Sequence, residues 1–222
     1  MVARYWDWQS SKPDDYFSER YGWNIVGRVR SHFLPGEILD YGCGTGGLIG
    51  PLLGTGQKVL GVDISQDSLR AVNARFGNQP NFLGTNKPEE LIALDKKFPT
   101  AILSEVVEHL EEDALDEVFS DLRELIGRNG VLIVTTPNNE NLADSEIYCP
   151  ACDHTFHRWQ HVRAWTPPSL RAYVESQGFS VERVVETSFS LPSGLLGATK
   201  GFVKHRLLGL PAPHLAVICR RK

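Results

Sequence analysis

A cluster of glycines placed directly after a short apolar run limits the fold of this chain more than any other feature. The run is Glu37–Tyr41, and the cluster has glycine at positions 42, 44, 46 and 47. Glycine tolerates positive φ and lets the backbone approach a ligand closely, because it has no Cβ. A strand that enters such a turn, with a helix beyond it, presents backbone N–H groups to a polar or anionic group. The cluster therefore predicts a ligand-binding turn between a first strand and a first helix.

Apolar runs and amphipathic stretches alternate along the rest of the chain. Further strands are expected at 58–64, 81–84, 99–103, 131–135, 180–185 and 214–219. Helices are expected from about Asp15, after the capping residue Ser65, from Asp113 to the glycines at 127 and 130, and over 167–176. Pro51 falls early in the helix after the glycines, so that helix should be short or irregular. The alternation predicts an α/β fold, with a mostly parallel sheet and helices on both faces.

The bulk properties exclude several classes of protein. The 222 residues suit one α/β domain, and a net charge of −4 argues against a nucleic-acid partner. No apolar run approaches the length of a membrane span, and the four cysteines form no regular disulfide framework, so a cytoplasmic location is the default expectation. We divide the chain into an N-terminal helical segment, 1–33, whose aromatic residues contribute to a pocket, and a main domain, 34–222. The stretch from about 139 to 166 is too long for a plain connection, which indicates a functional insertion.

The glycine spacing alone leaves the ligand open. Gly42, Gly44 and Gly47 also spell the dinucleotide fingerprint G-x-G-x-x-G, so a nicotinamide or flavin enzyme, or a tight turn without a ligand, remains an alternative. Asp40 precedes the first glycine by two positions, where a carboxylate would repel a pyrophosphate but receive an ammonium group. Asp63 closes the second strand, where a carboxylate accepts hydrogen bonds from a ribose diol. These two carboxylates favour a ligand that carries a ribose and an ammonium group.

Taken together, four segments resemble the motifs of the class I S-adenosylmethionine (SAM)-dependent methyltransferases, nearest the small-molecule group that includes the ubiquinone O-methyltransferases. The segments are 38–46, Val62-Asp63, Ser104-Glu-Val-Val-Glu-His-Leu110, and 128–138. The resemblance covers about residues 20 to 220. It implies a Rossmann-like doubly wound sheet of about seven strands, with one antiparallel strand near the C-terminus.

The resemblance also implies roles for individual residues. Gly42, Gly44 and Gly46 would pack against the methionine part and ribose of SAM, with Asp40 near the amino group. Asp63 would hold the ribose hydroxyls, and Ile64 would lie against adenine. Glu105 and Val106 would line the sulfonium side. Relatives commonly have an acidic residue after the third strand, whereas this chain has Gly84-Thr85-Asn86, so Thr85 or Asn86 is expected to take part instead. All these assignments rest on residues at matching motif positions.

His109 is the candidate general base for a hydroxyl acceptor, because imidazole titrates near neutral pH. The alternative is a histidine that only caps or packs at the start of a helix. The chain lacks the Asn/Asp-Pro-Pro-Tyr motif of the amine methylases that act on adenine or glutamine, which argues against that class.

The most distinctive segment of the chain is a cluster of cysteines and histidines inside the insertion. Cys149 and Cys152 have the C-x2-C spacing that binds one zinc ion, and His157 and His161 follow with the spacing H-x3-H. His154 is a substitute ligand for either histidine. Three interpretations stay open here: a structural zinc site, a metal-free lid that faces the acceptor, and a redox C-x-x-C pair.

The sequence therefore predicts a SAM-dependent methyltransferase that methylates a small-molecule acceptor, at oxygen, and releases S-adenosylhomocysteine. The alternatives are a methyltransferase that acts on a protein or other macromolecule, and a SAM-binding regulatory protein without turnover. The sequence leaves the existence of a homodimer open. A late basic cluster, at Lys200, Lys204, His205 and Arg206, is either a contact surface or a solvated loop.

Overall fold

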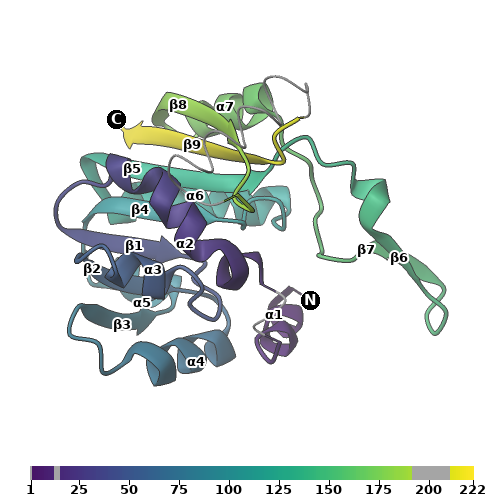
Figure 1. The fold of residues 1–222 in the computed structure, drawn as a ribbon, viewed down its shortest axis with the longest axis horizontal. Helices are drawn as coiled ribbons and strands as arrows, with labels where there is room; N and C mark the ends of the chain where they lie inside the picture. The colour runs from purple at the N-terminus through teal and green to yellow at the C-terminus, as the bar shows by residue number, and fades with distance from the viewer. Residues whose placement is uncertain (1, 13–15, 192–210) are drawn as a thin grey trace.

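The structure, a computed structural model, describes residues 2–12, 16–191 and 211–222. Its main element is a seven-stranded sheet in the order β3-β2-β1-β4-β5-β9-β8 (Figure 1). The strands are β1 (Glu37–Tyr41), β2 (Lys58–Val62), β3 (Phe82–Asn86), β4 (Phe98–Ser104), β5 (Ile126–Pro137), β8 (Phe179–Thr187) and β9 (His214–Arg221). Strand β9 pairs antiparallel with both β5 and β8, and all other neighbours are parallel. The predicted fold class is confirmed, including the single antiparallel strand near the C-terminus.

Helices cover both faces of this sheet. They are α1 (Val2–Gln9), α2 (Phe17–Val29) with the short 3-10 turn η2 (Arg30–His32), α3 (Ile49–Leu53), α4 (Gln66–Phe76), α5 (Pro88–Ala93), α6 (Glu112–Leu125) and α7 (Pro167–Ser176). The buried residues of α2, α3 and α4 form one core cluster, and those of α5, α6 and α7 form another. Neighbouring residues of β1 divide between the two, with Ile38 in the first and Leu39 in the second, because successive strand side chains point to opposite faces.

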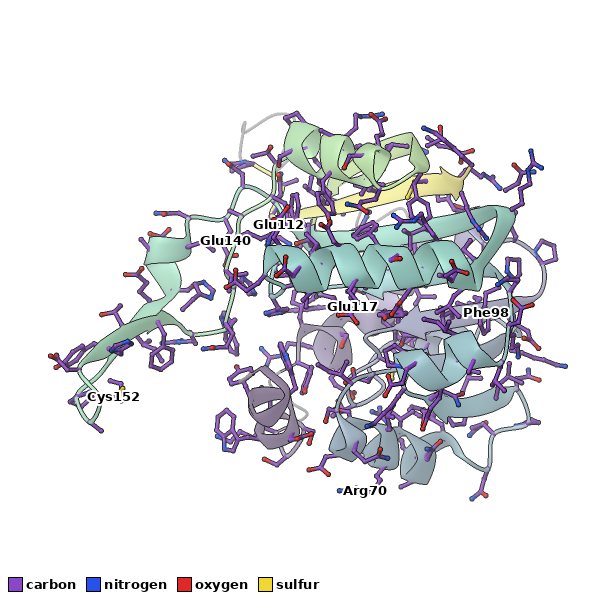
Figure 2. All side chains as sticks on the ribbon, turned by 180° about the vertical axis from the view of Figure 1, so that it is seen from behind. Arg70, Phe98, Glu112, Glu117, Glu140 and Cys152 are labelled. Carbon is purple, nitrogen blue, oxygen red and sulfur yellow. The ribbon has the colours of Figure 1, made fainter. Side chains whose placement is uncertain are left out.

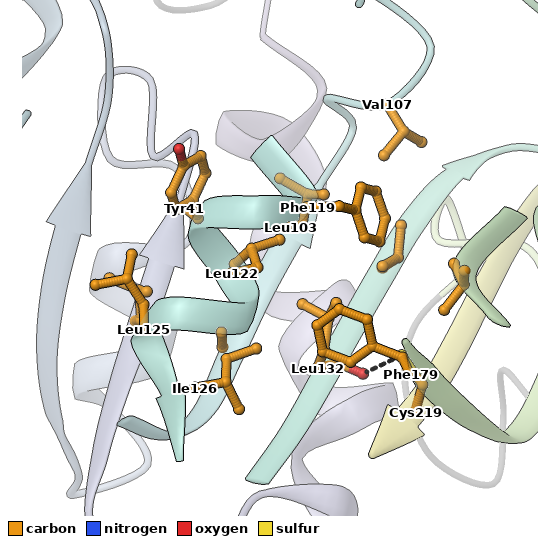
Figure 3. Packing of buried hydrophobic residues seen from close by; sticks show 14 of the residues in the cluster. Tyr41, Leu103, Val107, Phe119, Leu122, Leu125, Ile126, Leu132, Phe179 and Cys219 are labelled. Atoms are coloured by element: carbon orange, nitrogen blue, oxygen red, sulfur yellow. Dashed lines mark hydrogen bonds between the residues drawn. The ribbon is translucent and has the colours of Figure 1, made fainter. Parts of the chain in front are cut away.

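Helix α6 shows how an apolar stripe in the sequence becomes a buried face. Leu115, Phe119, Leu122 and Leu125 are each almost fully buried, and they join the cluster that contains the β5 residue Leu132 (Figure 3). The stripe was expected to continue into Ile126 before the glycines end the helix. Instead the backbone is already extended at Ile126, where β5 begins, so the helix ends before the glycines. A strand buries the Ile126 side chain as well as a helix does, so the apolar pattern alone does not show where the helix ends.

Local signals placed several element boundaries correctly. Helix α7 spans Pro167–Ser176 as predicted, and the Ser65 hydroxyl accepts a hydrogen bond from the Ser68 N–H at the start of α4. Helix α3, which contains Pro51, has only five residues. Helix α1 lies within the predicted N-terminal helical segment but ahead of the helix expected from about Asp15, and Asp15 and the basic cluster at 200–206 lie outside the described residues. Within the described part of the chain, no helix has the length and apolar character needed to cross a bilayer.

The insertion after β5 forms a separate hairpin. A 3-10 turn, η3 (Leu142–Ser145), leads into β6 (Glu146–Cys149), which pairs antiparallel with β7 (His154–His157) and with no other described strand. Figures 1 and 2 show this hairpin projecting from one side of the molecule, beyond the end of the seven-stranded sheet. We call residues 142–157 the hairpin arm. The chain returns to the body through 158–166 and enters α7.

Candidate active site

The glycine turn is tied to the end of β2 by backbone hydrogen bonds. The N–H groups of Gly42 and Cys43 both donate to the Val62 carbonyl, at 2.7 and 2.9 Å. The Gly44 N–H donates to Oδ2 of Asp63 at 2.8 Å, and the Ser65 N–H donates to Oδ1 at 2.8 Å. Asp63 therefore joins the turn to the start of α4, with a spare lone pair on each oxygen for a ligand.

Two of the predicted glycines have no room for a side chain on the cavity side. A Cβ at Gly42 would come 2.6 Å from Cγ2 of Val106, and a Cβ at Gly44 would come 3.2 Å from the Tyr16 ring, with φ of +79° and +51°. Both glycines line one large cavity. Gly46 faces α4 instead, where a Cβ would meet Phe76 at 2.8 Å, and it does not line the cavity. The resemblance implied that Gly46 packs against the cofactor, but in the structure Gly46 packs against α4.

The cavity has a volume of about 740 Å³, within the usual range of roughly 300–1,000 Å³ for small-molecule sites. Gly42, Gly44, Asp63 and Ile64 line one part of it. Glu105, Val106 and His109 line another, and Tyr5, Trp6 and Tyr16 of the N-terminal segment also face it. A hydrogen bond from the Ser65 hydroxyl to Asp7, at 2.7 Å, ties α1 to this wall.

Besides Gly46, three other residues that the resemblance implied, Asp40, Thr85 and Asn86, lie outside the cavity lining. Thr85 accepts a hydrogen bond from the Asn73 side chain at 2.7 Å, and the Asn86 carbonyl accepts from the Asp63 N–H at 3.4 Å. Asp40 is 1% exposed, and its Oδ2 has no hydrogen-bond partner among the described residues. Burial, followed by the charge of Asp63, raises the pKa of Asp40 to about 7. Its neighbours Tyr41 and Gly42 do line the cavity.

Glu105 sits at the end of β4 in a conformation that non-glycine residues rarely adopt, with φ of +55°. The Thr135 hydroxyl donates to Oε1 of Glu105 at 2.8 Å, and the Glu105 N–H donates to the Thr135 carbonyl at 2.9 Å. Burial raises the pKa of the Glu105 carboxyl. The strained backbone turns this carboxyl into the cavity, on the side where the resemblance places the sulfonium.

His109 is enclosed by other rings. The Trp6 and His161 rings meet it edge-on, with ring centres 4.8 and 4.7 Å away, and its buried Nδ1 has no hydrogen-bond partner in the described part of the chain. Nε2 lies 3.9 Å from Oε1 of Glu108, whose other oxygen accepts from the Thr136 hydroxyl at 2.9 Å. Burial, helped by the charge of His161, lowers the pKa of His109 to about 3. The ring is therefore neutral at ordinary pH and binds a proton weakly.

A second imidazole at the cavity wall is held by a carboxylate that the sequence analysis missed. His161 Nδ1 lies 2.5 Å from Oε2 of Glu140, and both residues line the cavity. An ionised carboxylate accepts from Nδ1–H, which leaves Nε2 of His161 unprotonated. Glu140 lies three residues beyond the carboxyl end of β5, where ligand-binding residues of such sheets gather, and this position was the available signal.

His157 supports this pair rather than entering the cavity. Its Nδ1 accepts hydrogen bonds from the N–H groups of His161 and Trp159, at 3.1 and 3.3 Å, and its ring stacks on His161. Because Nδ1 accepts, the proton of the neutral ring is on Nε2, which lies 3.6 Å from Oε1 of Glu140. Glu140 thus lies between two imidazoles.

The four ligands predicted for zinc are not brought together. Cys149 and Cys152 lie at the outer end of the hairpin arm, whereas His157 and His161 lie at its base (Figure 2 labels Cys152 and Glu140). Cys149 pairs with His154 and Glu146 with His157, so His157 stands three residues down the strand from the cysteines. At about 3.3 Å per residue, this separation of roughly 10 Å is too large for one tetrahedral ion. The described residues that approach the two histidines closely enough to share an ion with them are carboxylates and His109.

Comparison with known proteins identifies the family. A family model described as a methyltransferase domain matches residues 20–184. The chain belongs to this methyltransferase family. It is therefore a class I SAM-dependent methyltransferase, as the motifs and the strand order indicated.

Named relatives share moderate identity with the chain. The magnesium-protoporphyrin O-methyltransferase of Synechocystis sp. is 29% identical over 70% of this chain and 68% of its own length. The ubiquinone biosynthesis O-methyltransferase of Azorhizobium caulinodans is 28% identical over 80% and 72%. The human mitochondrial ubiquinone biosynthesis O-methyltransferase is 26% identical, and the chain spans only 50% of its length.

Solved structures share the fold at lower identity. The glycopeptide N-methyltransferase MtfA complexed with sinefungin superposes with a TM-score of 0.65 at 18% identity, covering 90% of this chain and 94% of that one. The DhpI–SAH complex gives 0.66 at 16% identity, covering 99% and 94%. These structures confirm the fold of the chain.

The residues present fit SAM. Its ribose and methionine parts need a surface without side chains, which Gly42 and Gly44 provide, and its ribose hydroxyls need an acceptor such as Asp63 at the cavity wall. Asp40 adds a buried carboxyl oxygen without a partner, beside the residues that line the cavity. The aromatic rings and the imidazoles stand in the remaining part of the same cavity, which leaves that part for an acceptor.

Proposed function

We propose that this methyltransferase methylates a hydroxyl group on a small, partly aromatic acceptor. The observation that carries this proposal is the position of the Glu140–His161 pair in the same cavity as the glycine turn. A hydroxyl acceptor must lose its proton during methyl transfer, and a carboxylate-held imidazole is suited to take it. The names of the relatives, O-methyltransferases of magnesium-protoporphyrin and of ubiquinone biosynthesis, point in the same direction.

SAM, when bound, supplies an activated methyl group, so the chain itself aligns the acceptor and manages its proton. Glu140 holds Nδ1–H of His161 and thereby presents Nε2 as the proton acceptor. His157 fixes the turn that carries His161, through the hydrogen bond from the His161 N–H. The proton leaves the acceptor oxygen for Nε2, and the resulting imidazolium is stabilised by the Glu140 carboxylate.

His109, the base predicted from the sequence, has a different part in this proposal. A pKa of about 3 makes His109 a weak proton acceptor and keeps its ring neutral. The ring can therefore accept a hydrogen bond from the acceptor hydroxyl without placing a second positive charge beside the SAM sulfonium. Its edge-on contact with His161 places the two rings around one point of the cavity. We assign His109 to orienting the acceptor hydroxyl and His161 to deprotonating it.

The acceptor is expected to be flat and partly apolar. Tyr5, Trp6 and Trp159 bring aromatic rings to the cavity wall, and Pro137 and Leu110 add apolar surface. Rings of this kind stack on a planar acceptor and orient it at little entropic cost. No acidic or basic group other than the carboxyls and imidazoles described above is needed to bind such a molecule.

The test is transfer of labelled methyl from SAM to a panel of phenols, catechols, sugars and amines, analysed for the methylated atom. We expect a phenol or catechol to be methylated at oxygen. His161→Gln and Glu140→Gln should lower kcat by about 100-fold or more, the usual contribution of a general base. His109→Gln should mainly raise KM. Methylation at nitrogen only, or full turnover in His161→Gln, would overturn the proposal.

A further inference from the structure

One buried carboxyl at the cavity wall takes no part in the proposed proton transfer. Glu108 is 2% exposed and lines the cavity, in the loop between β4 and α6. Its Oε2 accepts a hydrogen bond from the Thr136 hydroxyl at 2.9 Å, and Thr136 is itself fully buried on β5. Taking a carboxyl out of water costs free energy unless both oxygens find partners. One oxygen of Glu108 therefore has its partner in the chain, and the other decides whether that cost is offset.

The second oxygen of Glu108 is free to meet a ligand. Oε1 lies 3.9 Å from Nε2 of His109, beyond hydrogen-bond range, and no other side chain in the described part of the chain bonds to it. This oxygen is also not sealed off by protein, because the buried side-chain atoms without a partner include Nδ1 of His109 but not Oε1 of Glu108. Oε1 is therefore suited to hold a polar group of the acceptor.

Glu108 is held at a fixed position relative to His161. The Val162 N–H donates to the Glu108 carbonyl at 2.9 Å, which joins the segment that carries His161 to the loop that carries Glu108. One ligand atom of each of Glu108, His109 and His161 lies within 4.8 Å of the other two. Hydroxyls on neighbouring carbons span such a separation when each makes a hydrogen bond of about 2.8 Å. Glu108 and His161 can therefore bind two adjacent groups of one acceptor.

We propose that Glu108 determines acceptor specificity by binding, through Oε1, a second hydroxyl next to the one that His161 deprotonates. A hydroxyl pairs with a carboxyl in either protonation state, because it both donates and accepts. An acceptor without this hydroxyl leaves a buried polar atom unpaired, which is the situation in which enzymes discriminate most strongly between similar substrates. The inference rests on the proposed function for the hydroxyl at His161, whereas binding of the second hydroxyl by Glu108 is measured without turnover.

The experiment compares catechol with phenol, which lacks the second hydroxyl. Calorimetry measures the affinity of each compound for the full chain saturated with S-adenosylhomocysteine. We expect catechol to bind about 30-fold more tightly than phenol, the size of effect that one hydrogen bond to a charged or buried group produces. Glu108→Ala should bind the two compounds equally, with its affinity for phenol close to that of the wild type. Glu108→Gln, whose amide also donates and accepts, should keep part of the preference.

The matched control is Glu117→Ala, which removes an exposed carboxyl of α6 and should keep the whole preference for catechol. Binding of S-adenosylhomocysteine by each variant reports that it is folded. A structural role of Glu108 alone would weaken both compounds to the same extent, so the ratio of the two affinities separates the two roles.

Equal affinity of the wild type for catechol and phenol, or a preference that survives in Glu108→Ala, would overturn the inference. A preference that appears only with added magnesium or zinc chloride, and that a chelator removes, would also overturn it, because Glu108, His109 and His161 would then bind a cation. The labelled-methyl assay tests the proposed function separately. His161→Gln should lose turnover in that assay and still prefer catechol in the binding measurement, so either proposal can fail without the other.

Discussion

The glycine turn and the hairpin arm are both irregular segments that follow a strand, yet they reach order by opposite means. The turn is fixed from within: Asp63 receives hydrogen bonds from Gly44 and Ser65, and Val106 and Tyr16 close over the glycines. The arm carries its own short ladder and leaves Tyr148 and Cys152 exposed. A segment held by the core can be prepared for a small ligand, whereas the arm is held, among the described strands, only by its own pairing.

The largest effect expected from this comparison is in Asp63→Ala. The change removes the acceptor that ties the turn to α4 and that we expect to hold the ribose hydroxyls. Hydrogen bonds to charged groups contribute about 1.5–3 kcal/mol each, so the affinity for S-adenosylhomocysteine should fall by about 100-fold or more. Titration calorimetry measures this loss. Asp67→Ala, on the exposed first turn of α4, is the control and should bind normally.

Gly42→Ala tests the fit of the turn itself. The added Cβ would lie 2.6 Å from Cγ2 of Val106, and the alanine backbone would have to adopt a φ of +79°. Strain of about 2 kcal/mol corresponds to about 30-fold weaker binding of S-adenosylhomocysteine. Gly56→Ala is a matched control, because Gly56 has φ of +84° but open space around it. Equal affinity in the two variants would show that close approach at Gly42 is unimportant.

The buried carboxyl of Asp40 predicts a pH effect on stability. Its pKa is raised to about 7 from an ordinary value near 4, so the folded chain binds a proton that the unfolded chain has lost between these pH values. The stability that this group contributes is complete below about pH 4 and is lost as the pH rises through 7. Asp40→Asn should therefore melt roughly 10 °C above the wild type at pH 8 and show little difference at pH 4.5. An equal difference at both pH values would contradict the assignment.

The smallest effect is expected from the arm. Cys149→Ser changes only the exposed end of a hairpin that shares no strand pairing with the sheet. The affinity for S-adenosylhomocysteine should stay within about twofold of the wild type, since distant sites act independently. A loss of tenfold or more would mean that the arm and the cofactor site are coupled, and the contrast between the two regions would fail.

The same contrast explains what the sequence could predict. Strand β1, helix α7 and the Ser65 cap came from local patterns whose physical meaning does not depend on the rest of the fold. Gly42, Gly44 and Asp63, predicted to bind the cofactor, line one cavity because the carboxyl ends of parallel strands meet at one edge of the sheet. Gly46 was assigned to the cofactor because spacing cannot tell a glycine that faces a ligand from one that faces a helix.

The insertion was harder to predict because its register, and not its composition, decides which residues meet. The spacing of Cys149, Cys152, His157 and His161 fits one ion. The β6–β7 pairing, however, sets the thiols and the imidazoles at opposite ends of β7. Glu140, which holds His161, has no motif around it and is recognised only by its place after β5. Likewise, the burial that makes His109 a weak base depends on Trp6, which lies about a hundred positions away in the sequence.

The central claim is that the cavity beside the glycine turn holds SAM, and calorimetric titration of the full chain with S-adenosylhomocysteine tests it most directly. The account predicts saturable binding at one site per chain, which Asp63→Ala weakens by about 100-fold or more. Absence of such binding, together with tight binding of a nicotinamide dinucleotide at the same turn, would contradict it.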